Sequence, residues 1–217
     1  MSALKFILKE VKEELIQKAI VREKVHKKMR KVTSLSKQAI LFMHQKKYGD
    51  AKKLIEKTKQ LVDELRNTAQ EYPDIIYCGM FSAALQEYAE ARIFKRLVED
   101  DRFLVLNEIN VPAADYVLGL ADVVGEYRRM TLDALREGNS KKGEKCLEKM
   151  EEIYIELMAM DEAFMLVQGL RRKCDIARRV IETTRGDVTQ EVRRKELENH
   201  LKYFKKAQET KLKAKKE

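Results

Sequence analysis

Two pairs of acidic residues are spaced so that each pair lies on one face of a helix. Glu87 and Glu90 form the first pair, within LQEYAEA, and Asp122 and Glu126 form the second, within GLADVVGEYRR. Spacings of three and four residues place both members of a pair on the same side of a helix. Two adjacent helices of this kind could bring four carboxylates together around one hard cation. The sequence therefore predicts a metal site formed by all four acids.

Glu87 occupies a position that the apolar periodicity assigns to the core. It shares a three-four stripe with Ala84, Ala91 and Phe94. A carboxylate at such a position needs a partner, because burying an unpaired anion is costly or forces it to take up a proton. The partner is either a metal ion or a basic side chain of a neighbouring helix, and spacing alone leaves both open.

The second pair belongs to a weaker pattern. Asp115, Gly119, Asp122 and Glu126 form a line opposite the apolar stripe of their helix, which on its own is typical of a solvated surface. Gly119 and Gly125 argue against that interpretation, since glycine inside a helix costs about 1 kcal/mol relative to alanine. Close approach by another helix or by a ligand would explain them.

Carboxylates around a divalent ion are suited to hydrolysis of a phosphate ester. Such an ion lowers the pKa of a bound water and neutralises charge on the phosphate, while a carboxylate accepts a proton. We expect Mg²⁺, or Mn²⁺ in its place. Glu87, Glu90 and Asp122 are the expected ligands, and Glu126 is either a fourth ligand or the base.

Charge is distributed unevenly along the 217 residues. The formal net charge of +9 divides into +10 over residues 1–66, −7 over 67–192 and +6 over 193–217. An acidic centre between basic flanks suits a metal-dependent enzyme that acts on a polyanion. The basic residues near the acids could contact RNA, although arginines beside carboxylates are more often structural partners in helical bundles. These candidates are Arg92, Arg128, Arg129, Arg171, Arg172 and Lys173.

Helical periodicity with few breakers predicts an all-α protein, a single-domain antiparallel bundle of about seven helices over residues 1–217. The segment FLVLNEINVP is expected to be a loop or short extended linker, Asp187 to cap the last helix, and residues 209–217 to be a basic, disordered tail. The expected helices are 3–47, 50–71, 73–100, 112–137, 141–159, 161–185 and 187–208.

Several classes of protein are disfavoured by composition. No apolar run approaches the length of a membrane helix and no secretory leader is evident, so we expect a cytoplasmic protein without membrane contact. Cys78, Cys146 and Cys174 form no C-x-x-C motif, which indicates core thiols.

Three blocks resemble the translin family: YCGMFSAALQEYAEARIF, DYVLGLADVVGEYRRMTLDALREGN and GLRRKCDIARRVIETTRGDVT. The similarity runs from about Arg22 to about Thr189. The acidic blocks are nearer to the branch of translin-associated factor X (TRAX), whose members carry catalytic carboxylates. The chain has only residues 101–111 between those blocks, which is typical of a compact, archaeal-like homologue.

The resemblance implies an octameric shell around RNA with Mg²⁺-dependent endoribonuclease activity on single-stranded RNA. Glu87 and Glu90 match the acids of the family's QEYxEA motif, and Asp122 and Glu126 match those of GxADxxGE. A homo-oligomer is expected, with a translin-like partner subunit as an alternative.

Two other functions remain open at this point. Without a metal, the chain would be a non-catalytic translin-like protein that binds single-stranded nucleic acid. An E-x-x-E motif followed by a second acidic pair also resembles the all-α nucleoside triphosphate pyrophosphatases. A third alternative, a helical adaptor without nucleic acid, fits the basic flanks least well.

Overall fold

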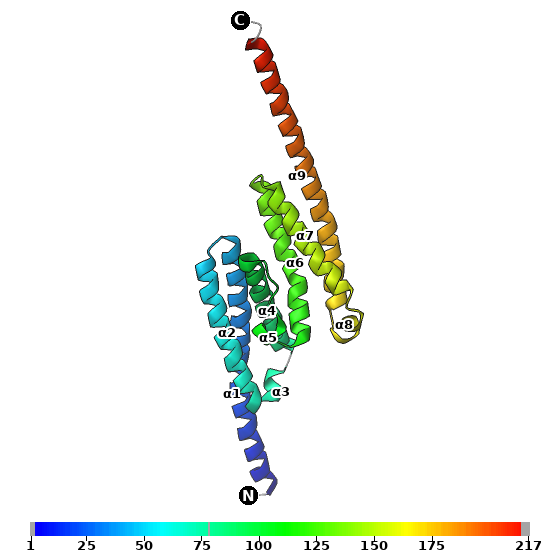
Figure 1. The fold of residues 1–217 in the computed structure, drawn as a ribbon. Helices are drawn as coiled ribbons and strands as arrows, with labels where there is room; N and C mark the ends of the chain where they lie inside the picture. The colour runs from blue at the N-terminus through cyan, green and yellow to red at the C-terminus, as the bar shows by residue number, and fades with distance from the viewer. Residues whose placement is uncertain (1–2, 78, 214–217) are drawn as a thin grey trace. The chain divides into compact units, whose positions relative to one another are not determined.

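The structure, a computed structural model, describes residues 3–77 and 79–213. Over these residues the chain is helical and contains no strand, which confirms the all-α class (Figure 1). Within the described ranges, no helix is both long and apolar enough to span a membrane. The helices are α1 (Ala3–His44), α2 (Tyr48–Glu71), α3 (Pro73–Ile76), α4 (Gly79–Asp100), α5 (Leu106–Ile109), α6 (Ala113–Arg136), α7 (Ser140–Met158), α8 (Asp161–Leu166) and α9 (Leu170–Lys213).

The chain forms two compact units, and the first comprises residues 1–123 and 162–170. Its centre is α1, which packs against both α2 and α4 (Figure 1). Met29 and Leu65 are fully buried and Phe94 is 1 % exposed, so the apolar faces of α1, α2 and α4 form the core of this unit. This core fixes the helix that carries Glu87 and Glu90.

The second unit comprises residues 124–161 and 171–217, which include the rest of α6, α7 and most of α9. The side chain of Asn139 caps α7 by accepting a hydrogen bond from the backbone N–H of Lys142. Cys146 and Cys174 are buried, and burial raises the pKa of both thiols. Both are core thiols as expected, whereas Cys78 lies outside the described residues.

Two expected elements differ from the structure in the first half of the chain. The helix expected over 73–100 is divided into α3 and α4. The expected linker FLVLNEINVP contains a short helix, α5, whose Glu108 carboxylate accepts a hydrogen bond from the backbone N–H of Val105 at 3.1 Å. Arg102 also donates to that carboxylate and holds the pKa of Glu108 down at about 2.

The expected break at Gly186 and Asp187 is wrong, because α9 continues through both residues. Asp187 does not cap a new helix. Its carboxylate accepts a hydrogen bond from the guanidinium of Arg128 at 2.6 Å. The break lies earlier, at Gly169, whose φ of +90° favours glycine. Of the expected tail, residues 209–213 belong to α9, and residues 214–217 lie outside the described residues.

Candidate functional site

α4 approaches α6 closely at Gly119. A Cβ atom at this position would lie 2.8 Å from the backbone oxygen of Gln86 and 2.9 Å from the backbone nitrogen of Glu90. Only glycine permits such contact without displacing one of the helices. The contact confirms that another helix approaches Gly119, and it sets the distance between the two acidic helices.

Asp115 lies one turn before Gly119 and is 4 % exposed, so the acidic line of α6 is not solvated at this end. Its Oδ1 accepts hydrogen bonds from Ser82 Oγ at 2.5 Å and from Gln86 Nε2 at 3.4 Å. Burial raises the pKa of Asp115, and the bonds from Ser82 and Gln86 act in the opposite direction. These bonds join α4 to α6 about two turns of α6 before Asp122.

Three of the predicted acids act on one ammonium group. Lys37 Nζ of α1 lies 3.0 Å from Glu87 Oε1. The pKa of Lys37 is raised, first by its hydrogen bond to Glu87 and the charge of that residue. Burial opposes the shift, and the charges of Glu90 and Asp122 add to it. The structure therefore gathers acids from α4 and α6 near one cation.

The carboxylates are near one another but do not form a ready coordination shell. Over residues 3–77 and 79–213, no three Asp, Glu, His or Cys side chains are grouped so as to hold a metal ion. The all-oxygen donor set itself fits Mg²⁺. Glu126 follows Asp122 by one turn of α6, is partly exposed, and belongs to the second unit.

Two details of the sequence interpretation need correction. The more deeply buried glutamate is Glu90, which is 8 % exposed, whereas the Glu87 side chain is 25 % exposed at the edge of the core. The buried face of α4 is wider than the stripe through Ala84, because Leu85 and Ala89 are buried as well. Gly125, in contrast to Gly119, has no atom within 4 Å of an added Cβ, so close approach does not explain it.

Two of the arginines proposed to contact RNA have structural partners. Arg92 donates to Tyr88 Oη at 2.8 Å and to the backbone oxygen of Glu108 at 3.3 Å. Arg128 donates to Thr184 Oγ1 at 2.9 Å and to Asp187. Both side chains therefore contribute to packing. Arg129, Arg171 and Arg172 are exposed and Lys173 is partly exposed, so their role in RNA binding stays a prediction.

Sequence reasoning missed two members of the site. Lys37 lies on α1, and nothing in its local sequence, SLSKQAI, connects it with acids on α4. Ser82 lies one turn before Gln86 and was missed because a serine within an apolar helix has no characteristic spacing. Only the packing of α1 and α6 on α4 brings these residues to the acids.

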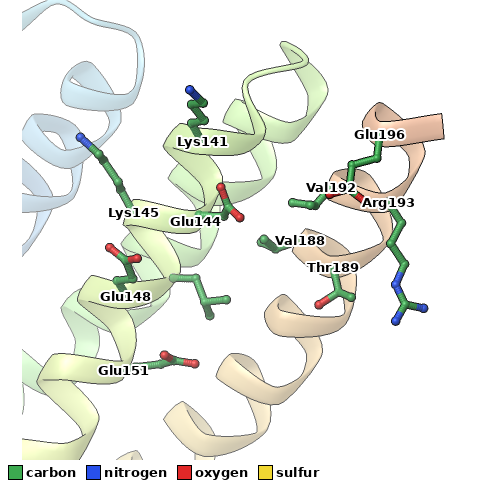
Figure 2. A pocket seen from close by; sticks show the side chains of 11 residues that line it. Lys141, Glu144, Lys145, Glu148, Glu151, Val188, Thr189, Val192, Arg193 and Glu196 are labelled. Atoms are coloured by element: carbon green, nitrogen blue, oxygen red, sulfur yellow. The ribbon is translucent and has the colours of Figure 1, made fainter. Parts of the chain in front are cut away.

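A cavity of about 780 Å³ in the second unit is separate from the predicted acids (Figure 2). Its walls are α7 and α9, with glutamates and lysines alternating along α7. Glu151 is held by Arg185, with 2.6 Å between Oε1 and Nη2. Carboxylates and basic groups share the cavity, so its charge does not select a cation or an anion.

The chain is an all-helical protein with an acidic site. The site contains the buried Glu90 of α4, which lies against Gly119, and the ammonium of Lys37. Comparison with known proteins supplies the family. The translin family model matches residues 20–188. The chain therefore belongs to the translin family.

Known relatives cover most of the chain. It is 31 % identical over 191 residues to an uncharacterised protein of Methanocaldococcus jannaschii, which covers 87 % of this chain and 84 % of the relative.

Solved structures share the fold. The crystal structure of AfC3PO is 34 % identical, with a TM-score of 0.76, and covers 85 % of this chain and 96 % of its own. AfC3PO in complex with duplex RNA is also 34 % identical, with a TM-score of 0.75, over 85 % and 95 % of the two chains. The structure of apo-NeC3PO is 24 % identical, with a TM-score of 0.75 over 88 % and 98 %, and this likeness concerns the fold alone.

Proposed function

We propose that this protein is a Mg²⁺-dependent endoribonuclease. It cleaves single-stranded RNA at the acidic site of α4 and α6, within an oligomeric shell of the translin type. We also propose, from the resemblance of its acidic blocks, that it belongs to the TRAX branch. Family membership alone names no reaction. The proposed reaction takes place at Glu87, Glu90, Asp122 and Glu126.

The observation that carries the proposal is the effect of three carboxylates on one ammonium. Glu87, Glu90 and Asp122 come from two helices, and all three raise the pKa of Lys37. Like charges at close range repel one another, and a divalent cation bound among the three would relieve this repulsion. The packing at Gly119 holds the two helices at this distance.

Each residue has a role that follows from its type. When bound, Mg²⁺ supplies charge neutralisation at the scissile phosphate and a water of lowered pKa. Glu87, Glu90 and Asp122 hold the ion through carboxylate oxygens. Glu126, one turn from Asp122 and partly exposed, is the proposed acceptor of the proton of the attacking water or a fourth ligand.

Lys37 pairs with Glu87 when the ion is absent. Its side chain is 63 % exposed. Exposed ion pairs contribute about 0–1 kcal/mol, so Lys37 can leave Glu87 at little cost. The ammonium is then free to contact an RNA phosphate beside the site.

RNA as the substrate is supported by the relative solved with duplex RNA. The basic flanks of this chain supply the attraction to phosphate that any nucleic acid requires. The preference for single strands comes from the family resemblance, so duplex RNA of the same sequence is the necessary comparison.

The test is to incubate the purified protein with labelled single-stranded and duplex RNA, in Mg²⁺ or in a chelator. Cleavage of the single strand in Mg²⁺ alone is expected. Glu90→Ala and Asp122→Ala should abolish cleavage while retaining RNA binding. Cleavage that survives the chelator or both substitutions contradicts the proposal.

A second candidate is a non-catalytic translin-like protein that binds single-stranded nucleic acid. It is favoured by one observation, namely that the described residues contain no group of three side chains arranged for a metal. RNA binding without any cleavage in Mg²⁺ or Mn²⁺ would establish this candidate. The pyrophosphatase alternative loses its basis, because the translin match covers both acidic pairs.

A further inference from the structure

A second cavity, of about 600 Å³, lies along α1 and α2 within the first unit and shares no residue with the acidic site. Its charged wall consists of Lys24, Lys27, Lys28 and Lys31 of α1. These residues are spaced by three and four, which places all four ammonium groups on one face of the helix. We call this feature the lysine pocket.

Most of this positive charge is not neutralised by the protein. Lys28 Nζ lies 2.8 Å from Glu64 Oε2 of α2. For Lys24, Lys27 and Lys31, the part of the chain that the structure describes offers no ion-pair partner. Like charges three and four residues apart destabilise a helix. An anion bound between the three lysines would remove this repulsion.

Apolar residues and one aromatic ring also line the lysine pocket. Val25, which is 3 % exposed, and Leu61 line it together with Tyr72. Tyr72 lies at the junction of α2 and α3. Its N–H donates to the backbone oxygen of Thr68 at 3.0 Å, and its own oxygen accepts from the N–H of Ile76 at 3.2 Å. The backbone of the tyrosine is therefore fixed.

We propose that the lysine pocket binds a nucleotide of a single-stranded RNA, a proposal that rests on the proposed function. Adjacent phosphates contact Lys24, Lys27 and Lys31, and one base stacks on Tyr72. Aromatic side chains stack on any base and lysines follow the phosphates, the combination typical of single-strand binding. Glu71 also lines the lysine pocket, and its carboxylate can accept a hydrogen bond from a ribose hydroxyl. Inorganic phosphate has no base or ribose to fill the apolar part.

The experiment measures binding of a 5′-fluorescein-labelled 12-nucleotide RNA by fluorescence anisotropy in a chelator, where no cleavage occurs. The pocket variant combines Lys24→Ala, Lys27→Ala and Lys31→Ala. The control combines Lys12→Ala, Lys202→Ala and Lys205→Ala, three exposed lysines outside the family-matched residues. Both variants lose the same charge, so only position distinguishes them.

The pocket variant should bind at least tenfold more weakly than the control variant. Each lost phosphate contact lowers the salt slope by about 0.7, so the slope should fall by about 2 in the pocket variant and by less in the control, whose lysines belong to the basic flanks but line no part of the lysine pocket. Replacing the same three lysines by arginine should restore binding. Equal affinities and slopes for the pocket and control variants overturn the proposal.

Tyr72→Ala should weaken binding roughly 5- to 150-fold, the range expected for one base stacked on an aromatic ring, whereas Tyr72→Phe should bind as the wild type does. Wild-type affinity in Tyr72→Ala, with helix content and Tm retained, contradicts the stacking. Light scattering completes the test. A pocket variant with a changed subunit number would show that the lysine pocket is a contact between copies, which also overturns the proposal.

The experiments show whether the inference about the lysine pocket or the proposed function is wrong. If the wild type neither binds nor cleaves RNA, the proposed function fails and the inference fails with it. If the wild type binds and cleaves RNA but the pocket variant equals the control, only the inference fails. Glu90→Gln, which alters the acidic site alone, should retain binding in the chelator.

Discussion

Lys37 is the residue through which α1 neutralises the acids of α4 and α6. Its ammonium contacts Glu87, yet most of its side chain is in solvent. A neutral side chain at this position would remove this ammonium from Glu87. The affinity of the acids for a divalent ion should then increase.

Lys37→Gln is therefore expected to lower the Mg²⁺ concentration that gives half-maximal RNA cleavage. The reduction should be up to about fivefold, the equivalent of an exposed ion pair of at most about 1 kcal/mol. Cleavage rates across a Mg²⁺ titration measure it, with the exposed lysine variant Lys52→Gln as control. Loss of cleavage at every Mg²⁺ concentration would show instead that the ammonium acts on the substrate.

Asp115 makes stability depend on pH in a defined direction. Its pKa in the folded protein is raised above 3.8, so between the two values the folded state holds a proton that the unfolded state releases. The free energy of unfolding contributed by this group therefore falls as pH rises from about 3.8 through the raised value.

Asp115→Asn removes this titration and keeps an oxygen that can accept the hydrogen bond from Ser82. Relative to wild type, the variant should gain stability as pH rises through that window. Chemical denaturation of both proteins at several pH values between 3.5 and 7 measures the difference. A stability difference independent of pH over this range would exclude a raised pKa.

At the residue scale, spacing was sufficient to predict which acids gather, but not which one is buried. Apolar residues spaced by three and four predicted a buried carboxylate on α4. They assigned it to Glu87, whereas Glu90 is the more deeply buried of the two. The buried face of α4 is wide because both α1 and α6 contact it. That width depends on tertiary packing, as does the pairing of Lys37 with Glu87.

The spacing of α4 and α6 depends on one glycine. Gly119→Ala places a Cβ 2.8 Å from backbone and side-chain atoms of α4, which must move apart. Overpacking of this kind costs about 1–3 kcal/mol. We expect a lower free energy of unfolding and slower RNA cleavage, because the two acidic helices separate.

Gly125→Ala is the matched control on the same helix. Nothing lies within 4 Å of its added Cβ, so the substitution should stabilise the protein by about 0.5–1 kcal/mol through helix propensity. Thermal and chemical denaturation of the two variants measure both effects. Equal effects in the two variants would contradict the close approach at Gly119.

At the element scale, local signals predicted most helix ends but not the interruptions. Asn139 caps α7 as its sequence indicates, since the capping bond spans three residues. Asp187 has the same local signal and serves another purpose, because Arg128 of α6 binds its carboxylate. The sequence alone does not distinguish a capping aspartate from one that pairs with a distant arginine.

The whole molecule has an apolar stripe that neither unit buries. Leu4, Leu8, Val11 and Leu15 of α1 are 44 to 63 % exposed, share one helical face and precede the family-matched residues. Contiguous exposed apolar surface of this kind marks an interaction site. In the proposed oligomeric shell, a second copy of the chain would cover this stripe.

Leu8→Gln combined with Val11→Gln is expected to yield a smaller assembly than the wild type forms. Removing one buried apolar side chain from an interface weakens association by about 1.5–3 kcal/mol. Light scattering of the purified proteins measures the mass. The control, Lys9→Gln with Glu13→Gln, alters an exposed ion pair on another face of α1 and should leave the mass unchanged. Identical masses for both variants and wild type would exclude the stripe from assembly.

The central claim is that acids of α4 and α6 bind a divalent cation. Titration with Mn²⁺, followed by electron paramagnetic resonance of the free ion, tests it without depending on the choice of RNA. Wild-type protein should bind Mn²⁺, and the isosteric variants Glu90→Gln and Asp122→Asn should each bind at least tenfold more weakly, with helix content unchanged. Undiminished Mn²⁺ binding in both variants, or no binding by the wild type, would contradict the account.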